Sequence, residues 1–259
     1  MKTKLIFIAI AIFGVLSVAM PVAAQTKSSA DAASEAYRAG DFKKSIELYN
    51  GIVAQRLSEG EESAEIYYNL GNAYFRDNQL AEAILYYERA LLLNPGDSDI
   101  RHNLRFARTR IEDKIDTSGS LFLTNWVNSI QNRFNSNTWG SVAVVLFILF
   151  LLCVGGYLFL RVLWIKKAAF YTGIVVFALM IVANLFAFRQ KNLQIDRNTG
   201  IVMAAAASIR TSPDTNSKEL FQLHAGTKVK VKDTDGNWYE IEIANGSVGW
   251  IPKENVEII

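Results

Sequence analysis

The sequence has few of the residues that hold metals, disulfides or redox centres. In 259 residues it contains one cysteine, Cys153, and two histidines, His102 and His224. A single cysteine excludes an internal disulfide and any CxxC motif, and the two histidines lack the spacing of metal ligands. The net charge is only +2, so no overall positive field favours nucleic acid. We therefore expect no metal, no cofactor and no nucleic-acid partner.

Catalytic motifs are also missing. The chain has no GxSxG nucleophile elbow, no HExxH zinc motif, no phosphate-binding P-loop and no cysteine–histidine pair. One group of acids lies close together near the C-terminal end, in a stretch of turn signals and alternating residues that explains them as charges facing water. Its members are Asp233, Asp235, Glu240 and Glu242. We expect that the protein is not an enzyme.

Apolar residues make up 51% of the chain and are concentrated in three runs. The first run, Leu5–Met20, follows Lys2 and Lys4 and ends in small residues. This is the pattern of a signal peptide, with cleavage after Ala24. The alternative is an uncleaved anchor. Both interpretations send the chain from residue 25 onward across a membrane.

The other two runs, residues 141–160 and 168–188, contain no charged residue. A helix of about 20 residues spans about 30 Å, the thickness of the hydrocarbon core, so each run predicts a transmembrane helix. The short loop between them carries Arg161, Lys166 and Lys167 and no acid, which favours a cytoplasmic loop. Both folded parts of the chain would then lie on the periplasmic side of a bacterial inner membrane.

Residues 64–95 follow the pattern of a helical repeat. Tyr67 and Tyr74 stand at the large aromatic positions, Gly71 and Ala83 are small where two helices would cross, and Pro95 closes the unit. The stretch resembles a tetratricopeptide repeat, a pair of antiparallel helices that commonly binds peptides or helices.

A more degraded copy precedes it over residues 28–59, with Ser45 placed 38 residues before Ala83. A third helix over 98–115, with Asp97 or Ser98 as its cap, would cover the last repeat. Residues 26–115 are therefore predicted to form one helical repeat domain.

Two groups of side chains in this domain are candidates for binding a protein. The first lies on the first helix of the clearer repeat and comprises Tyr67, Tyr68, Asn69, Asn72 and Tyr74, although repeat packing explains most of the tyrosines equally well. The second lies on the third helix and comprises Arg101, Arg105 and Arg108. These arginines would grip an acidic partner or phosphate headgroups, or they form an ordinary solvated helix face.

The linker, residues 116–138, contains a second amphipathic pattern. Phe122, Trp126, Ile130 and Phe134 recur at steps of four, with polar residues on the other faces. The pattern predicts a helix lying at the membrane interface. The alternative is a helix packed on the repeat domain.

Residues 200–259 read as about five short strands joined by tight turns such as Asp235-Gly236 and Asn245-Gly246. The motifs Ser208–Pro213, Leu223–Thr227 and Gly249–Pro252 resemble those of bacterial SH3 domains. The resemblance implies an all-β, SH3-like small barrel that binds peptides or cell-wall fragments or serves as a spacer. Its candidate groove residues are Trp238, Tyr239 and Trp250, and the alternative is that the tryptophans complete the small core.

The fold class predicted is thus a multidomain membrane protein with all-α tetratricopeptide repeats, a two-helix transmembrane hairpin and an SH3-like barrel. This order, with residues 94–104 leading out of the repeats, resembles the BatE family of the Bacteroides aerotolerance group. The resemblance implies a non-enzymatic scaffold in an oxidative-stress complex. Its partners would be other inner-membrane proteins with von Willebrand A domains and, indirectly, a MoxR-type ATPase. The alternative is a cell-wall sensor whose SH3-like domain contacts peptidoglycan.

Overall fold

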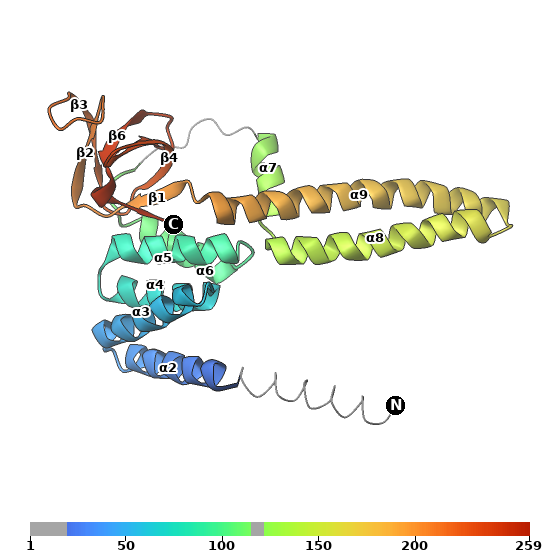
Figure 1. The fold of residues 1–259 in the computed structure, drawn as a ribbon, viewed down its shortest axis with the longest axis horizontal. Coiled ribbons are helices and arrows are strands. Elements are labelled where there is room, and N and C mark those ends of the chain that lie inside the picture. Colours follow the sequence, from blue (N-terminus) through green and yellow to red (C-terminus); the bar gives the residue numbers. More distant parts are fainter. Residues whose placement is uncertain (1–19, 115–121) are drawn as a thin grey trace, which may run out of the picture.

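The computed structural model describes residues 20–114 and 122–259 (Figure 1). A stack of helices and a small sheet lie together at one end, and a long hairpin of two helices extends away from them. Most of the predicted signal segment lies outside the described residues, as do residues 116–121 of the predicted linker. Residues 20–24, which the same prediction includes, belong to the first described helix.

Two antiparallel helix pairs form the repeat domain, and they repeat with the predicted offset of 38 residues. Gly40 and Asn78, one offset apart, end the first helix of each pair with positive φ angles of 83° and 65°. Ser45 and Ala83 are both fully buried where the helices cross. The hydroxyl of Ser45 donates to the carbonyl of Ala33. The helices are α2 (Met20–Arg38), α3 (Phe42–Ser58), α4 (Ala64–Arg76) and α5 (Leu80–Leu93).

The close crossing predicted at Gly71 is present. A Cβ atom placed on Gly71 would lie 2.8 Å from the ring of Tyr87, whose side chain is buried in the same core. The extra residues of the first repeat fall partly within α3, which has 17 residues where α5 has 14. The loop between α3 and α4 therefore holds only part of the insertion.

The third helix, α6 (Ser98–Arg108), is shorter than the 98–115 expected. Asp97 caps it, since its carboxylate accepts from the backbone N–H groups of Asp99 and Ile100. The helix ends early because residues beyond it turn toward the sheet. There Ile111 packs near Gly226, and Asp113 binds His224 and Thr227.

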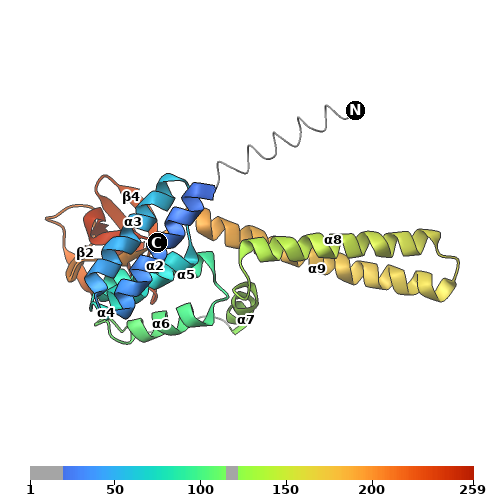
Figure 2. The same ribbon diagram turned by 90° about the horizontal axis from the view of Figure 1, so that it is seen from below.

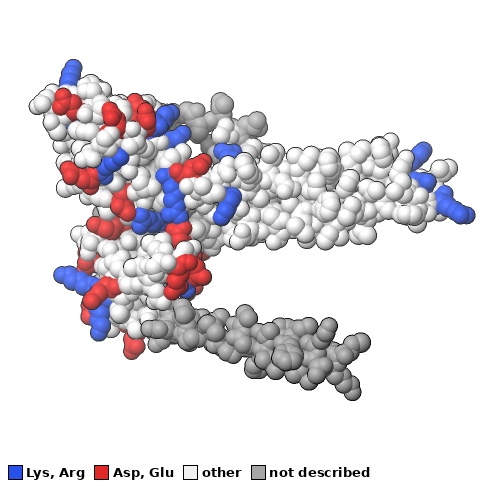
Figure 3. Space-filling view, in the orientation of Figure 1, with Lys and Arg blue, Asp and Glu red and all other residues white. Residues whose placement is uncertain are grey.

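A short helix, α7 (Phe122–Gln131), precedes the hairpin of α8 (Ser136–Phe159) and α9 (Leu163–Asp196). Both hairpin helices are long and apolar enough to span a membrane. They exceed the predicted runs, apart from Leu160, which caps α8 rather than belonging to it. Figure 3 shows no charge along the length of the hairpin and basic side chains at its far tip. The repeat domain and the sheet lie together at the opposite end.

Within the described residues, seven antiparallel strands form one sheet in the order β3-β2-β6-β5-β4-β1-β7. The sequence indicated about five, because the first three strands lack strong alternation. The two tight turns expected are present, with positive φ at Gly236 and Gly246. The strands are β1 (Thr199–Val202), β2 (Ala206–Arg210), β3 (Glu219–His224), β4 (Lys228–Asp235), β5 (Trp238–Glu242), β6 (Val248–Pro252) and β7 (Val256–Ile258).

The sheet has its own core, which includes Ile209, Ile241 and Ile251. Two other residues of the same β domain, Ile201 and Ile259, instead join the buried cluster of the repeat domain. The two domains therefore share apolar packing, and β1 lies against α5. The fold class predicted from the sequence is confirmed: helical repeats, two apolar helices and an SH3-like sheet.

Candidate functional site

The seam between the repeat domain and the β domain is built around a buried acid. Glu88 of α5 is 5% exposed. Its carboxylate accepts from the ammonium of Lys228 on β4 at 2.9 Å and also pairs with the guanidinium of Arg108 on α6. A buried carboxylate requires such partners, because an unpaired charge away from water is costly. Glu88 thus joins three elements that are far apart in the sequence.

A second polar contact lies at the other end of the seam. The carboxylate of Asp113 accepts from the backbone N–H of His224 at 2.7 Å, from the hydroxyl of Thr227 at 2.6 Å and from Nδ1 of His224 at 2.7 Å. The bond to Asp113 raises the pKa of His224, with Glu112 contributing in the same direction. Burial alone would raise the pKa of Asp113, but the bonds from Thr227 and His224 outweigh it and lower that pKa.

Apolar and backbone contacts complete the seam. Gly226 has a φ of 92°, and a Cβ there would lie 2.6 Å from Ile111 and 3.1 Å from Ile84. On α5, Arg89 donates to the carboxylate of Glu257 at 2.8 Å and to the carbonyl of Ile258 at 2.6 Å. The relative position of the two domains is therefore fixed by many independent contacts.

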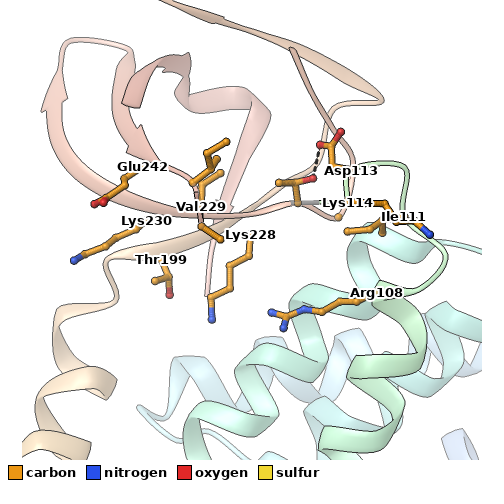
Figure 4. Close-up of a pocket in the computed structure, with 13 residues that line it drawn as sticks. Arg108, Ile111, Asp113, Lys114, Thr199, Lys228, Val229, Lys230 and Glu242 are labelled. Carbon is orange, nitrogen blue, oxygen red and sulfur yellow. Dashed lines mark hydrogen bonds between the residues drawn. The ribbon is translucent and has the colours of Figure 1, made fainter. Parts of the chain in front are cut away.

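Beside the seam lies an open cleft of about 700 Å³ (Figure 4). Its charged lining residues are mainly basic, and in Figure 4 the side chains of Arg108 and Lys228 approach one another from α6 and β4. Of the two acids in the lining, Asp113 binds His224, and Glu242 pairs with Lys232 at 3.2 Å. The charged lining residues are Arg108, Asp113, Lys114, Lys228, Lys230 and Glu242. Because Arg108 and Lys228 pair with Glu88, Lys114 and Lys230 are the lining cations that face an acidic side chain of a partner.

The repeat domain has its own groove between α4 and α6. The amide oxygen of Asn72 accepts from the hydroxyl of Tyr87 at 2.7 Å and from the amide of Asn103 at 2.9 Å. Burial raises the pKa of Tyr87, so its hydroxyl remains a neutral donor. Asn103 also donates to the hydroxyl of Tyr68 at 3.0 Å. These bonds hold the polar floor of the groove in one arrangement.

The groove encloses about 290 Å³ and opens to solvent past aromatic side chains. Phe106 is 46% exposed, and the guanidinium of Arg110 lies over both Phe106 and Phe75, at 4.8 and 4.9 Å from their ring centres. A cation on aromatic rings beside amide groups can hold a peptide by stacking and hydrogen bonds. The lining residues are Tyr37, Asn72, Phe75, Tyr87, His102, Asn103 and Phe106.

The structure divides the predicted aromatic and amide candidates. Asn72 lines the groove, and Tyr68 belongs to its hydrogen-bond network. Tyr67 is 3% exposed and donates to Glu62, which makes it part of the core. Tyr74 stacks on Tyr86 of α5 and so contacts the packing side of α4, and Asn69 is half-buried on the same helix.

The three predicted arginines have different surroundings. Arg101 donates to the carbonyls of Pro95 and Gly96, which ties the start of α6 to the preceding turn. Arg108 pairs with Glu88 in the seam. Arg105 is exposed and forms no ion pair with any described residue. All three are exposed, and their spacing of four and three residues places them along one side of α6.

The three predicted groove residues of the β domain lie on two faces of the sheet. Trp250 is opposite Glu240, and Trp238 is opposite Pro252, so both tryptophans are on the face away from the core. Tyr239 alternates to the inner face, where it packs on the core and carries Lys253 over its ring at 5.2 Å. The tryptophan face is partly exposed and is available for stacking.

The sequence did not predict the residues that face the candidate binding residues from other elements. His102, Asn103 and Phe106 complete the groove, and Glu88 and Asp113 build the seam. The helical periodicity of residues 98–115 predicted the buried side of α6 but not which elements its other residues would face. Among residues 20–114 and 122–259, no three His, Cys, Asp or Glu side chains come together as a metal site would require.

These features define a class: a helical repeat and a small β domain, docked together on a hairpin able to span a membrane. Comparison with known families specifies both modules. Residues 64–97 match the family model of the tetratricopeptide repeat, and residues 205–257 match that of the bacterial SH3 domain. No curated protein matches the chain. Both modules are typical of protein interaction, which supports an interaction or adaptor role.

Proposed function

We propose that the protein is a membrane-anchored, non-enzymatic scaffold that binds a peptide or helix of a partner in the groove between α4 and α6. The observation that carries the proposal is the groove itself. It combines a fixed amide floor at Asn72 and Asn103 with an exposed aromatic mouth at Phe106. A tetratricopeptide unit uses such a surface to hold extended or helical segments.

In this proposal the hairpin crosses the bacterial inner membrane and leaves both domains in the periplasm. Within residues 141–160 and 168–188, the exposed side chains are almost all apolar, including Leu152 at 67% and Leu185 at 60% exposed. An apolar surface of that extent requires lipid or another protein. Confinement to the membrane raises the effective concentration of the groove near membrane-bound partners.

The order of domains further supports a scaffold of the Bacteroides aerotolerance type, as the BatE resemblance implies. The partners would then be inner-membrane proteins with von Willebrand A domains and, through them, a MoxR-type ATPase. The cleft at the seam, where the basic side chains of Lys114 and Lys230 face solvent, would provide a second contact for an acidic segment of such a partner.

Site-specific photocrosslinking in native membranes tests this proposal. A photoreactive residue at His102, in the groove, should capture the same inner-membrane proteins in repeated preparations. The same residue at Glu47, exposed on α3 outside the groove, is the matched control. Equal capture at both positions, or none at His102, would contradict the groove as the binding site.

A second candidate function, a cell-wall sensor, is favoured by the outward-facing Trp238 and Trp250. Aromatic rings on an exposed sheet face can stack on sugar rings of peptidoglycan. The full chain in mild detergent should then sediment with purified sacculi, and Trp250→Ala should reduce the bound fraction. Asn216→Ala, in the exposed loop after β2, serves as the control. Sedimentation unaffected by Trp250→Ala would reject this function.

A further inference from the structure

The short helix α7 is fixed to the base of the hairpin by buried polar contacts. Gln131, at its end, is 2% exposed. Its carbonyl accepts from Nε1 of Trp139 on α8 at 2.9 Å and from the amide of Gln190 on α9 at 3.3 Å. The same Gln190 amide donates to Asn132 at 3.0 Å. The orientation of α7 relative to the hairpin is therefore set by the fold.

One face of α7 is directed at the repeat domain. Asn128 and Asn132 line a cavity of about 670 Å³ whose other walls include Leu91, Pro95 and Arg101. Gly96 lies against the backbone of Arg133, just after the helix. The polar side of α7 thus faces the soluble part of the molecule.

The opposite face of α7 is apolar and uncovered. Successive residues of a helix are rotated by about 100°, so Trp126 and Ile130 lie roughly opposite Asn128 and Asn132. Trp126 is 57% exposed and Ile130 is 37% exposed. This face therefore points away from the repeat domain.

The uncovered face continues into the apolar surface of the hairpin. Phe134, which follows α7 and is 43% exposed, contacts Trp139 at 5.4 Å between ring centres. Trp139 in turn contacts Phe186 of α9 at 5.0 Å, within the third apolar run, residues 168–188. The boundary between polar and apolar surface of the molecule thus passes through α7.

The direction of α7 matches this boundary. Figures 1 and 2 show α7 crossing the base of the hairpin rather than running along it. If α8 and α9 cross a bilayer, such a helix lies in the plane of its surface. Arg133, Arg189 and Lys191 are exposed and are neighbours in the chain of the bonded pair Asn132 and Gln190. They therefore lie near the end of α7, where lipid phosphates would be.

We propose that α7 binds the lipid surface of the same bilayer, with Trp126, Ile130 and Phe134 at the boundary between headgroups and acyl chains. Amphipathic helices bury their apolar face to this depth. The contact rests on the proposed membrane crossing of the hairpin. Because α7 also contacts the repeat domain, this lipid contact would hold the groove and the cleft at a fixed distance from the membrane surface.

Environment-sensitive fluorescence tests the contact in the full chain. In a Cys153→Ser background, single cysteines at Ile130, Asn128 and Leu152 are labelled with a nitrobenzoxadiazole probe and reconstituted in phosphatidylcholine–phosphatidylglycerol vesicles. The probe at 130 should emit at shorter wavelength than at 128 and be quenched roughly two-fold or more by lipid labelled with doxyl near the headgroup. Trp126→Cys should reproduce the result at 130.

The outcomes separate the two proposals. A probe at 130 that emits at no shorter wavelength than the probe at 128 overturns the α7 contact. A blue-shifted probe at 130 that lipid does not quench also overturns it, since protein then covers the face. The probe at 152, on the exposed side of α8, reports whether the hairpin is in lipid. A blue-shifted probe at 152 without quenching at 130 leaves the membrane anchor in place and rejects only α7.

Discussion

Gly71 shows how one missing side chain sets the distance between two helices. Tyr87 fills the space that a Cβ on Gly71 would enter, and the carbonyl of Ala83 lies 3.3 Å from the same point. The hydroxyl of Tyr87 also donates to Asn72, so the ring has little room to move. The groove floor and the helix crossing therefore depend on the same residue.

Gly71→Ala should lower the free energy of unfolding by about 1–3 kcal/mol, because overpacking forces backbone shifts. Gly51→Ala is the matched control. Gly51 is helical and exposed, with open space around it, and alanine there should stabilise by about 0.5–1 kcal/mol. Thermal unfolding followed by circular dichroism measures both. A neutral Gly71→Ala would contradict the close crossing.

Glu88 is the residue on which the seam depends most. Glu88→Gln removes the charge that both Arg108 and Lys228 require, and it should destabilise the chain by about 1–2 kcal/mol, since hydrogen bonds to charged groups contribute more than neutral ones. Glu82→Gln, in the first turn of the same helix, should change stability by less than about 0.5 kcal/mol. Chemical denaturation of the two variants compares them, and equal effects would argue against the paired carboxylate.

Among the elements, helix type and order followed from the sequence, but several ends did not. Periodicity predicted the repeat helices, and uncharged runs predicted the hairpin. The end of α6 and the extension of α9 depend on contacts with residues far away in the chain. After α6, Asp113 bonds His224, so the chain leaves the helix there. In the extension of α9, Gln190 donates to the carbonyl of Gln131 at the end of α7, and Gln194 donates to the carbonyl of Leu92.

The same reason limited what could be foreseen of the site. Tyr68 and Asn72 could be named because the repeat pattern assigns positions along α4. Their partners Asn103, His102 and Phe106 come from the next helix, whose facing direction depends on how it packs. On the β domain, strand alternation separates Tyr239 from Trp238, but the pairing that puts Trp250 beside Glu240 is a tertiary property.

α9 is the element that links the hairpin to the folded domains. At about 1.5 Å per residue its 34 residues extend about 51 Å, well beyond a hydrocarbon core of about 30 Å. Asn192→Pro should break this helix between the apolar run and β1, since proline removes a backbone bond and clashes with the preceding turn. Limited proteolysis should then cleave near residue 192 far faster than in Asn192→Ala. Equal cleavage would show that the extension is not helical in solution.

At the scale of the whole molecule, the docking of the two domains should depend on pH. The pKa of His224 is raised by its bond to Asp113. The stabilisation that protonated His224 gives to docking is therefore complete below the ordinary histidine pKa, and it is lost as pH rises through the raised value. The pKa of Asp113 is lowered, so its contribution is present above the ordinary aspartate pKa and is lost as pH falls through the lowered value. Docking should be tightest between about pH 4 and about pH 6.5.

The unfolding midpoint should therefore fall as pH rises from mildly acidic to alkaline. His224→Gln should remove most of this trend, whereas His102→Gln, on the exposed side of α6, should retain it. Differential scanning calorimetry at several pH values measures the trend. A trend that persists in His224→Gln would assign it to other groups.

The arrangement of the whole chain also predicts which parts are accessible from one side of a membrane. Both domains lie at one end of the hairpin and Ile165 lies in the first turn of α9 at the other. In a Cys153→Ser background, a membrane-impermeant maleimide added to spheroplasts should label cysteine at Asn245 but not at Ile165. Labelling of both, or only of Ile165, would contradict the proposed orientation.

The unbroken course of α9 has a mechanical consequence. Its backbone is helical from the tip of the hairpin to Asp196. Arg197, which ends the helix with a φ of 35°, pairs with Glu62 just before α4, and β1 begins two residues later. No hinge separates the lipid-exposed turns from the docked ones along this helix. A neighbouring helix in the bilayer could tilt or rotate the hairpin. Because α9 is continuous, that movement would be transmitted to both domains as a rigid-body motion.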